Sequence, residues 1–167
     1  SHGLLVVFLG TLLENTLLLG FFVPGALIIL LAGVSAQDGA LSIPGAFALG
    51  LAGTVLGDTV SYFMGRFGWS KVGRGSLVTF AEKVREPILR RGPLFVLIYH
   101  FAGYTRLVGP AAAGLLRMPY RRWAVADHLG AALWVAVFLG IGYGLAAAGI
   151  TLDTTDRWFR IFEWALL

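Results

Sequence analysis

The segment LLVVFLGTLLENTLLLGFFVPGALIILLAGV, residues 4–34, decides the fold that the sequence predicts. As one helix its 31 residues would be about 46 Å long, whereas the hydrocarbon core of a bilayer is about 30 Å thick. The segment is interrupted at Pro24-Gly25, where proline removes a helical hydrogen bond and glycine permits a turn. We therefore predict a re-entrant helical hairpin over about 16–33, with Pro24 and Gly25 as its breakers. A single kinked and tilted span is the alternative.

The composition is that of a chain surrounded mostly by lipid. Of its 167 residues, 57% are hydrophobic and 13% are charged, and the mean hydropathy is +0.80. Soluble domains carry about 25% charged residues, so this composition excludes a disordered chain, a nucleic-acid-binding domain and an ordinary soluble enzyme. The absence of cysteine excludes disulfides and thiolate metal sites. We expect one membrane domain over 1–167, without a cofactor, a metal site or a nucleic-acid partner.

Basic residues are concentrated in two segments of the chain. Residues 1–65 contain no Lys or Arg, whereas 66–91 carry seven basic residues and 117–122 carry three. The positive-inside rule places both basic segments on the cytoplasmic side and 35–42 on the opposite side. Within the first segment, apolar residues alternate with charged ones at helical spacing, which indicates a cytoplasmic surface helix over 70–92.

The remaining apolar stretches predict two full spans and a second hairpin. Residues 43–65 and 123–150 are each long enough to cross the membrane. The stretch 93–116 has basic flanks at both ends, so one straight crossing would place one of them outside. We expect it to fold back on itself, with Gly109 and Pro110 as breakers.

These elements together predict an all-α polytopic membrane protein in which two re-entrant hairpins enter from opposite faces. This arrangement is an inverted repeat, as in many secondary transporters. The tail 153–167 alternates polar and aromatic residues and indicates an interfacial helix or an incomplete span. A stripe of small residues in the first span permits a homodimer and equally serves internal packing; its members are Ala46, Gly50, Gly53 and Gly57.

Several ionisable residues lie within these apolar stretches. Each ionised group at the bilayer centre costs about 2.5–3.5 kcal/mol, so such groups must pair or face water. If the hairpin tips meet, Glu14 and Arg106 are natural counter-charges. A functional interpretation is a polar chamber in which Arg106 holds an anion and Glu14 exchanges a proton, because a guanidinium suits phosphate or carboxylate. The alternative is a structural ion pair that joins the two hairpins.

Four further residues are candidates for the same chamber. Asp58 and Tyr62 share one helix face, and Asp58 serves either helix packing or the chamber. His100 is either structural or able to titrate near neutral pH. Asp127 follows the second basic segment, where it would neutralise an arginine or cap the span that starts at residue 123.

The order and spacing of several motifs resemble the DedA family, whose conserved region is also called the VTT or SNARE-associated domain. The matching motifs are Glu14…Pro24-Gly25, Gly57-Asp58-x3-Tyr62-x2-Gly65-Arg66-x-Gly68, Arg106-x3-Pro110-x2-Ala113-Gly114-x3-Met118, Gly130-Ala131-x2-Trp134 and Gly142-Tyr143. The resemblance covers roughly residues 10–150 and implies two facing re-entrant hairpins and a role in moving lipids across membranes. It implies that Glu14 and Arg106 are the family's first acidic residue and second arginine. The chain departs from the usual family residues at Ala26, His100, Gly103 and Asp127.

The combined interpretation is a lipid transporter of the bacterial inner membrane that is not an enzyme. The resemblance favours undecaprenyl phosphate as the lipid phosphate, with membrane lipids as partners and a proton or sodium ion as the coupling ion. Alternatives are a phospholipid scramblase or a proton-coupled small-ion transporter. From other classes, a lipid-phosphate enzyme or a purely structural membrane protein stays open.

Overall fold

The computed structural model contains only helices among the residues that it describes. These residues are 2–16, 24–68, 79, 83, 85, 86, 92, 94, 96–101 and 104–150. The elements are α1 (His2–Asn15), α2 (Gly25–Gln37), α3 (Ile43–Phe63), the π-helical turn η1 (Met64–Gly68), α5 (Tyr104–Leu115) and α6 (Tyr120–Ala147). The prediction of an all-helical chain is therefore confirmed. The predicted interfacial tail 153–167 lies outside the described residues, and the predicted surface helix 70–92 is described only at isolated positions.

Two helices have the length and composition of membrane spans. They are Ile43–Phe67, which combines α3 with most of η1, and α6. They correspond to the spans predicted at 43–65 and 123–150. The first begins where Ser42 accepts a hydrogen bond from the Gly45 amide, a typical helix N-cap. The two helices run antiparallel and pack on each other, since Tyr62 stacks on Trp123 with their ring centroids 4.5 Å apart.

The first apolar segment forms two separate short helices. Helix α2 begins directly after Pro24, as the predicted break requires, and α1 ends at Asn15. Residues 17–23, which hold nearly all of the first arm of the hairpin predicted over about 16–33, lie outside the described part. The two helices are antiparallel neighbours. Gly10 lies against Ile28, and the Ala26 amide donates to Glu14 at the end where α1 stops and α2 starts.

The small-residue stripe of α3 packs against α1. A Cβ atom at Gly53 would overlap the Phe8 carbonyl oxygen and the Thr11 hydroxyl, and one at Gly57 would overlap Asn15. Only glycine permits this backbone approach. Of the two uses predicted for the stripe, the structure shows internal packing, because α1 already covers it.

Helix α5 corrects one prediction about the second hairpin. Gly109 and Pro110 were expected to break the chain, but the helix runs without interruption from Tyr104 to Leu115 with Pro110 inside it. Proline inside a helix removes the hydrogen bond to the carbonyl four residues earlier, and its ring crowds that carbonyl. Residues 111–113 are fully buried, and this packing holds the turn in helical form. Within the predicted hairpin 93–116, the chain does not turn back between Tyr104 and Leu115.

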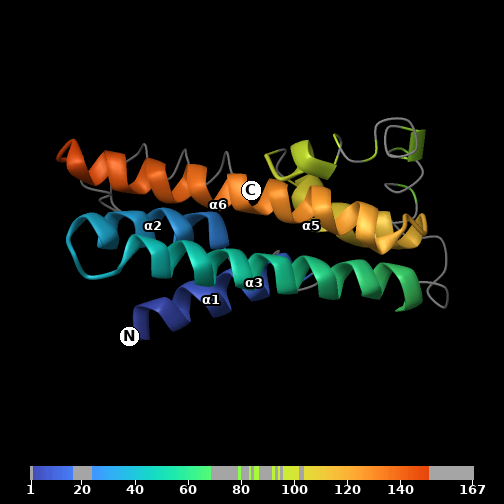
Figure 1. The fold of residues 1–167 in the computed structure, drawn as a ribbon, viewed down its shortest axis with the longest axis horizontal. Helices are drawn as coiled ribbons and strands as arrows, with labels where there is room; N and C mark the ends of the chain where they lie inside the picture. The colour runs from blue at the N-terminus through green and yellow to red at the C-terminus, as the bar shows by residue number, and fades with distance from the viewer. Residues whose placement is uncertain are drawn as a thin grey trace.

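The short helices occupy opposite ends of the α3–α6 pair. Figure 1 shows α2 beside one half of this pair and α5 beside the other half. Close backbone contacts agree with the view, because Gly142 of α6 lies on Leu30 of α2, and Gly65 lies on Ala111 of α5. The last turn of α1 and the first turn of α5 consequently meet near the middle of the molecule.

Candidate functional site

Glu14 and Arg106 form a bidentate ion pair between α1 and α5. Arg106 Nη1 donates to Glu14 Oε1 at 3.1 Å, and Arg106 Nη2 donates to Glu14 Oε2 at 2.9 Å. The two side chains are 8% and 7% exposed, so little solvent screens the pair. The structure thus brings together the two residues that the sequence predicts as counter-charges. Two parallel charge-assisted hydrogen bonds are the strongest form of this contact.

Three neighbours complete the surroundings of this pair. Asn15 Oδ1 accepts a hydrogen bond of 3.0 Å from Arg106 Nη2, and the indole ring of Trp134 lies 3.5 Å from the guanidinium carbon. On the other side, the Ala26 amide donates to Glu14 Oε1 at 3.2 Å. This amide belongs to the first turn of α2, where unpaired N–H groups and the helix dipole favour an anion. The Glu14 carboxylate therefore lies between the Arg106 guanidinium and the start of α2, and both stabilise its negative charge.

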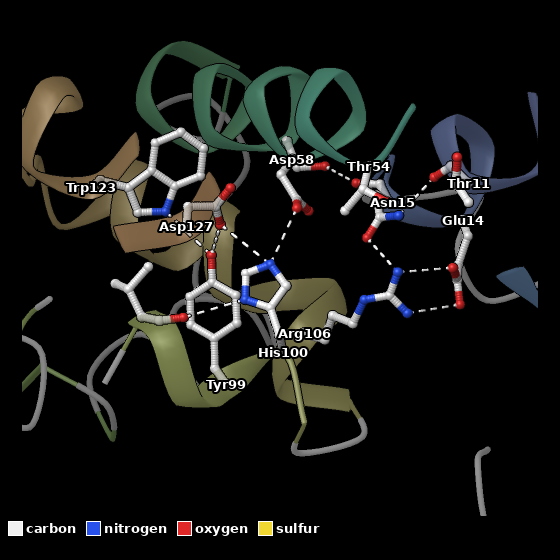
Figure 2. A network of polar contacts seen from close by, with 12 residues as sticks. Thr11, Glu14, Asn15, Thr54, Asp58, Tyr99, His100, Arg106, Trp123 and Asp127 are labelled. Atoms are coloured by element: carbon white, nitrogen blue, oxygen red, sulfur yellow. Dashed lines mark hydrogen bonds and ion pairs between the residues drawn. The ribbon is translucent and has the colours of Figure 1, made fainter. Parts of the chain in front are cut away.

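Asp58, His100 and Asp127 form a second buried group (Figure 2). His100 Nε2 lies 3.5 Å from Asp58 Oδ2 and 3.8 Å from Asp127 Oδ1. Asp58 comes from α3, Asp127 from α6 and His100 from the turn that precedes α5. We call these three residues the Asp–His–Asp cluster.

Aromatic and backbone groups orient the Asp–His–Asp cluster. The Tyr99 hydroxyl donates to Asp127 Oδ1, and Trp123 Nε1 donates to the Tyr99 oxygen at 3.3 Å. His100 Nδ1 faces the Val96 carbonyl oxygen at 3.3 Å. Figure 2 shows this chain of contacts leading from Trp123 to His100.

Two predicted site residues have different surroundings from those expected. Asp127 was expected to neutralise an arginine of the second basic segment or to cap the span. It is instead fully buried in the cluster, because its place in the second turn of α6 points it at His100 and Tyr99. Tyr62 lies apart from both charged groups, since its hydroxyl donates to the Met118 carbonyl and accepts from Arg66.

Sequence reasoning missed four residues that shape these two groups. Asn15 and Trp134 contact Arg106, while Tyr99 and Trp123 orient Asp127. The only sequence signal for them is local: Asn15 and Tyr99 each adjoin a predicted ionisable residue inside an apolar stretch. The two tryptophans are indistinguishable from packing residues in the sequence.

The resemblance implies departures at four positions, of which Gly103 lies outside the described residues and the other three lie in two different places. Ala26 sits beside Glu14 and packs against an apolar cluster that includes Trp134. His100 lies in the Asp–His–Asp cluster, where it contacts Asp127, another departure. Two of the unusual residues of this chain are therefore in contact with each other.

A largely apolar cavity lies beyond these polar groups. It has a volume of about 380 Å³ and is lined by residues of α2, α3 and α6. Gly33, Phe47 and Tyr143 are among its walls. The cavity offers apolar surface at the end of the molecule where α2 packs on α6.

Comparison with known proteins gives matches along most of the chain. A sequence profile of the VTT domain matches residues 23–144. The uncharacterized membrane protein slr0232 of Synechocystis sp. is 31% identical over 173 aligned positions, which cover 100% of this chain and 78% of the relative. The inner membrane protein YghB of Escherichia coli is 32% identical over 146 positions, which cover 84% of this chain and 67% of YghB.

Further relatives extend the same comparison. The inner membrane protein YohD of Escherichia coli is 30% identical over 154 positions, covering 90% of this chain and 80% of YohD. The chain spans about two thirds of the length of membrane proteins from Buchnera aphidicola, at 66% and 65% of those relatives. No solved structure matches the chain.

Proposed function

This chain belongs to the VTT-domain (DedA) family of membrane proteins, and on that premise we propose that it moves a lipid phosphate from one leaflet to the other. The observation that supports this most is the buried Arg106 guanidinium, which is held by Glu14 at the meeting point of two short helices. The family resemblance favours undecaprenyl phosphate as the lipid and the bacterial inner membrane as the location.

The guanidinium is the group that would recognise the phosphate. Its planar fork already holds one two-oxygen anion, the Glu14 carboxylate, and phosphate offers the same spacing of acceptors. Among the described residues Arg106 Nε has no hydrogen-bond partner, which leaves its N–H for a further acceptor. Trp134 covers a face of the guanidinium and fixes its plane.

Glu14 would act as the exchangeable partner of Arg106. When a phosphate takes the guanidinium, a charged Glu14 left beside it would add a second buried anion. Uptake of a proton by Glu14 removes that charge and couples lipid binding to proton movement. Release of the phosphate and loss of the proton would restore the ion pair seen in the structure.

We infer that the short helices re-enter the membrane instead of crossing it. Helices α1 and α2 have 14 and 13 residues and are about 21 and 20 Å long, short of a hydrocarbon core of about 30 Å. Helix α5 has 12 residues and is about 18 Å long. Their broken ends meet at Glu14 and Arg106, which supports two hairpins related as an inverted repeat.

Other parts of the protein would contact the hydrocarbon chain of the lipid and the anionic headgroups of the membrane. The cavity among α2, α3 and α6 would accept part of a hydrocarbon chain. The basic segments 66–91 and 117–122 would attract anionic headgroups on the cytoplasmic side, at about 1 kcal/mol per basic residue. In this role the protein would act as a carrier, because moving a lipid between leaflets makes and breaks no covalent bond.

Leaflet exchange in liposomes tests this function. Purified protein is reconstituted with fluorescently labelled undecaprenyl phosphate, and loss of the label's accessibility to an impermeant quencher is followed over time. We expect exchange well above protein-free liposomes. Arg106→Ala and Glu14→Gln should abolish it, whereas Asp38→Asn, at an exposed acid after α2, should leave it unchanged.

The same liposomes separate the competing functions. Equal exchange of labelled phosphatidylcholine would indicate a scramblase, and release of inorganic phosphate would indicate a lipid-phosphate enzyme. No exchange by a correctly folded protein, or exchange that neither substitution alters, would support a structural role for the ion pair.

A further inference from the structure

The Asp–His–Asp cluster brings together two buried carboxyl groups that, among the described residues, no arginine or lysine contacts in an ion pair. Asp58 and Asp127 are 0% exposed and His100 is 2% exposed, so water does not screen them. Arg106 donates to Glu14 and Asn15, and among the described residues no ion pair joins it to either aspartate. Two carboxylates enclosed together without a counter-charge are strongly unfavourable in a low-dielectric interior.

The orientation of His100 turns a lone pair toward both carboxylates. Its Nδ1 lies within hydrogen-bonding distance of the Val96 carbonyl oxygen, which can only accept a hydrogen bond, so Nδ1 carries the hydrogen of the neutral ring. Nε2 is then the unprotonated nitrogen, and it is the atom that faces Asp58 and Asp127. Three electron-pair donors therefore point at one place, which is the arrangement that a cation requires.

Most donor atoms at this place are unsatisfied. Within the part of the chain that the structure describes, both oxygens of Asp58, Oδ2 of Asp127 and Nε2 of His100 are buried without a hydrogen-bond partner. One ligand atom from each residue lies within 4.8 Å of the other two. Ligands of a single ion bound at about 2.0–2.2 Å are separated by about 3–4.4 Å, so small side-chain movements would bring all three into coordination distance.

Neighbouring groups orient the candidate ligands by hydrogen bonds, as is typical of metal sites in proteins. A metal-binding histidine typically donates its other ring N–H to a backbone carbonyl, as His100 does to Val96. Asp127 is held by the Tyr99 hydroxyl, which Trp123 orients in turn. At Gly130 a Cβ atom would come within 2.7 Å of His100 Nδ1, so glycine there leaves room for the imidazole.

We propose that Asp58, His100 and Asp127 bind one divalent transition-metal ion that fastens α3, α6 and the segment before α5 together. One imidazole and two carboxylates suit Zn²⁺ or Mn²⁺, and the ion's two positive charges balance the two aspartates. The sequence predicted no metal site, because it has no cysteine and no pair of closely spaced histidines; the three ligands meet only in the folded chain. The inference is independent of the proposed lipid transport.

Metal content of the purified protein tests this site. The protein is prepared in detergent without a polyhistidine tag and in a His2→Ala background, which removes a second histidine at the chain start. Zn²⁺ and Mn²⁺ are measured by mass spectrometry after growth in supplemented medium and after chelation and reloading. We expect about one ion per chain, and at least a tenfold loss in Asp58→Asn, His100→Gln and Asp127→Asn. The control Asp38→Asn, an acid outside the cluster, should retain the ion.

A positioning variant and a spectroscopic measurement complete the test. Tyr99→Phe keeps all three ligands but frees Asp127, so affinity should fall about 10–100-fold. Pulsed electron paramagnetic resonance of the Mn²⁺-loaded original protein should show coupling to one imidazole nitrogen, which decides the question even if the variants do not fold. Absence of bound metal after reloading, absence of nitrogen coupling, or full metal retention in the three ligand variants would overturn the proposal. Because no transport is measured, failure here is distinct from failure of the lipid-carrier function.

Discussion

Arg106 Nη2 donates a 2.9 Å hydrogen bond to Glu14 Oε2, although 92 positions separate the two residues in the sequence. This contact joins the end of α1 to the start of α5, two helices that are each too short to cross a bilayer. Neither charge is stable in this interior alone, so the ion pair fixes where the two helices meet.

Removing one member of this pair should destabilise the protein. We expect Glu14→Gln to lower the free energy of unfolding in detergent by about 3–5 kcal/mol, because Arg106 would keep a buried and uncompensated charge. Denaturant titration of the purified protein measures the effect. Adding Arg106→Gln to Glu14→Gln should recover part of the loss, and a double variant as unstable as the sum of the single ones would contradict the pairing.

A matched pair of glycines on α6 tests the packing of α2. A Cβ atom at Gly142 would overlap the Leu30 carbonyl, whereas the same atom at Gly144 meets nothing within 4 Å. We expect Gly142→Ala to destabilise the protein by about 1–3 kcal/mol. Gly144→Ala should be neutral or stabilising by up to about 1 kcal/mol, because alanine is the better helix former. Thermal unfolding in detergent compares the two, and equal effects would argue against this interface.

The Tyr99 hydroxyl links Trp123 Nε1 and Asp127 Oδ1 through two hydrogen bonds. Tyr99→Phe would remove the acceptor of Trp123 Nε1 and the donor to Asp127 Oδ1. We expect a loss of about 1–3 kcal/mol, the usual cost of leaving buried polar groups unsatisfied. Tyr143→Phe, at a half-exposed position, should change stability by less than about 0.5 kcal/mol. Unfolding midpoints of the two variants give the comparison.

The predicted topology can be tested in this cysteine-free chain. Single cysteines at Asp38, Lys83 and Arg121 occupy exposed positions. With a membrane-impermeant maleimide applied to intact cells, Asp38→Cys should react. Lys83→Cys and Arg121→Cys should react only after the inner membrane is opened, because the basic segments are expected on the cytoplasmic side. The opposite labelling pattern would refute the two-hairpin arrangement.

The features that the sequence predicted well depend on local physics. The lengths of the apolar stretches predicted the spans that became α3 and α6, and Pro24-Gly25 predicted where α2 begins. The wrong prediction, a break at Gly109-Pro110, came from applying a local rule where tertiary packing dominates. The helix continues through Pro110 into the fully buried residues 111–113, despite the lost hydrogen bond and the crowding by the proline ring.

The pairing of Glu14 with Arg106 could be inferred from the sequence because two charges in an apolar chain have few possible partners. The Asp–His–Asp cluster could not, because its members lie on three elements whose register depends on the packing of the whole bundle. The sequence by itself determined that this is an all-helical membrane chain with two spans and broken segments, since hydropathy and chain-breaking residues act locally. Only the tertiary structure decided which buried polar groups meet, because contacts between distant residues follow from how helices pack and not from their spacing along the chain.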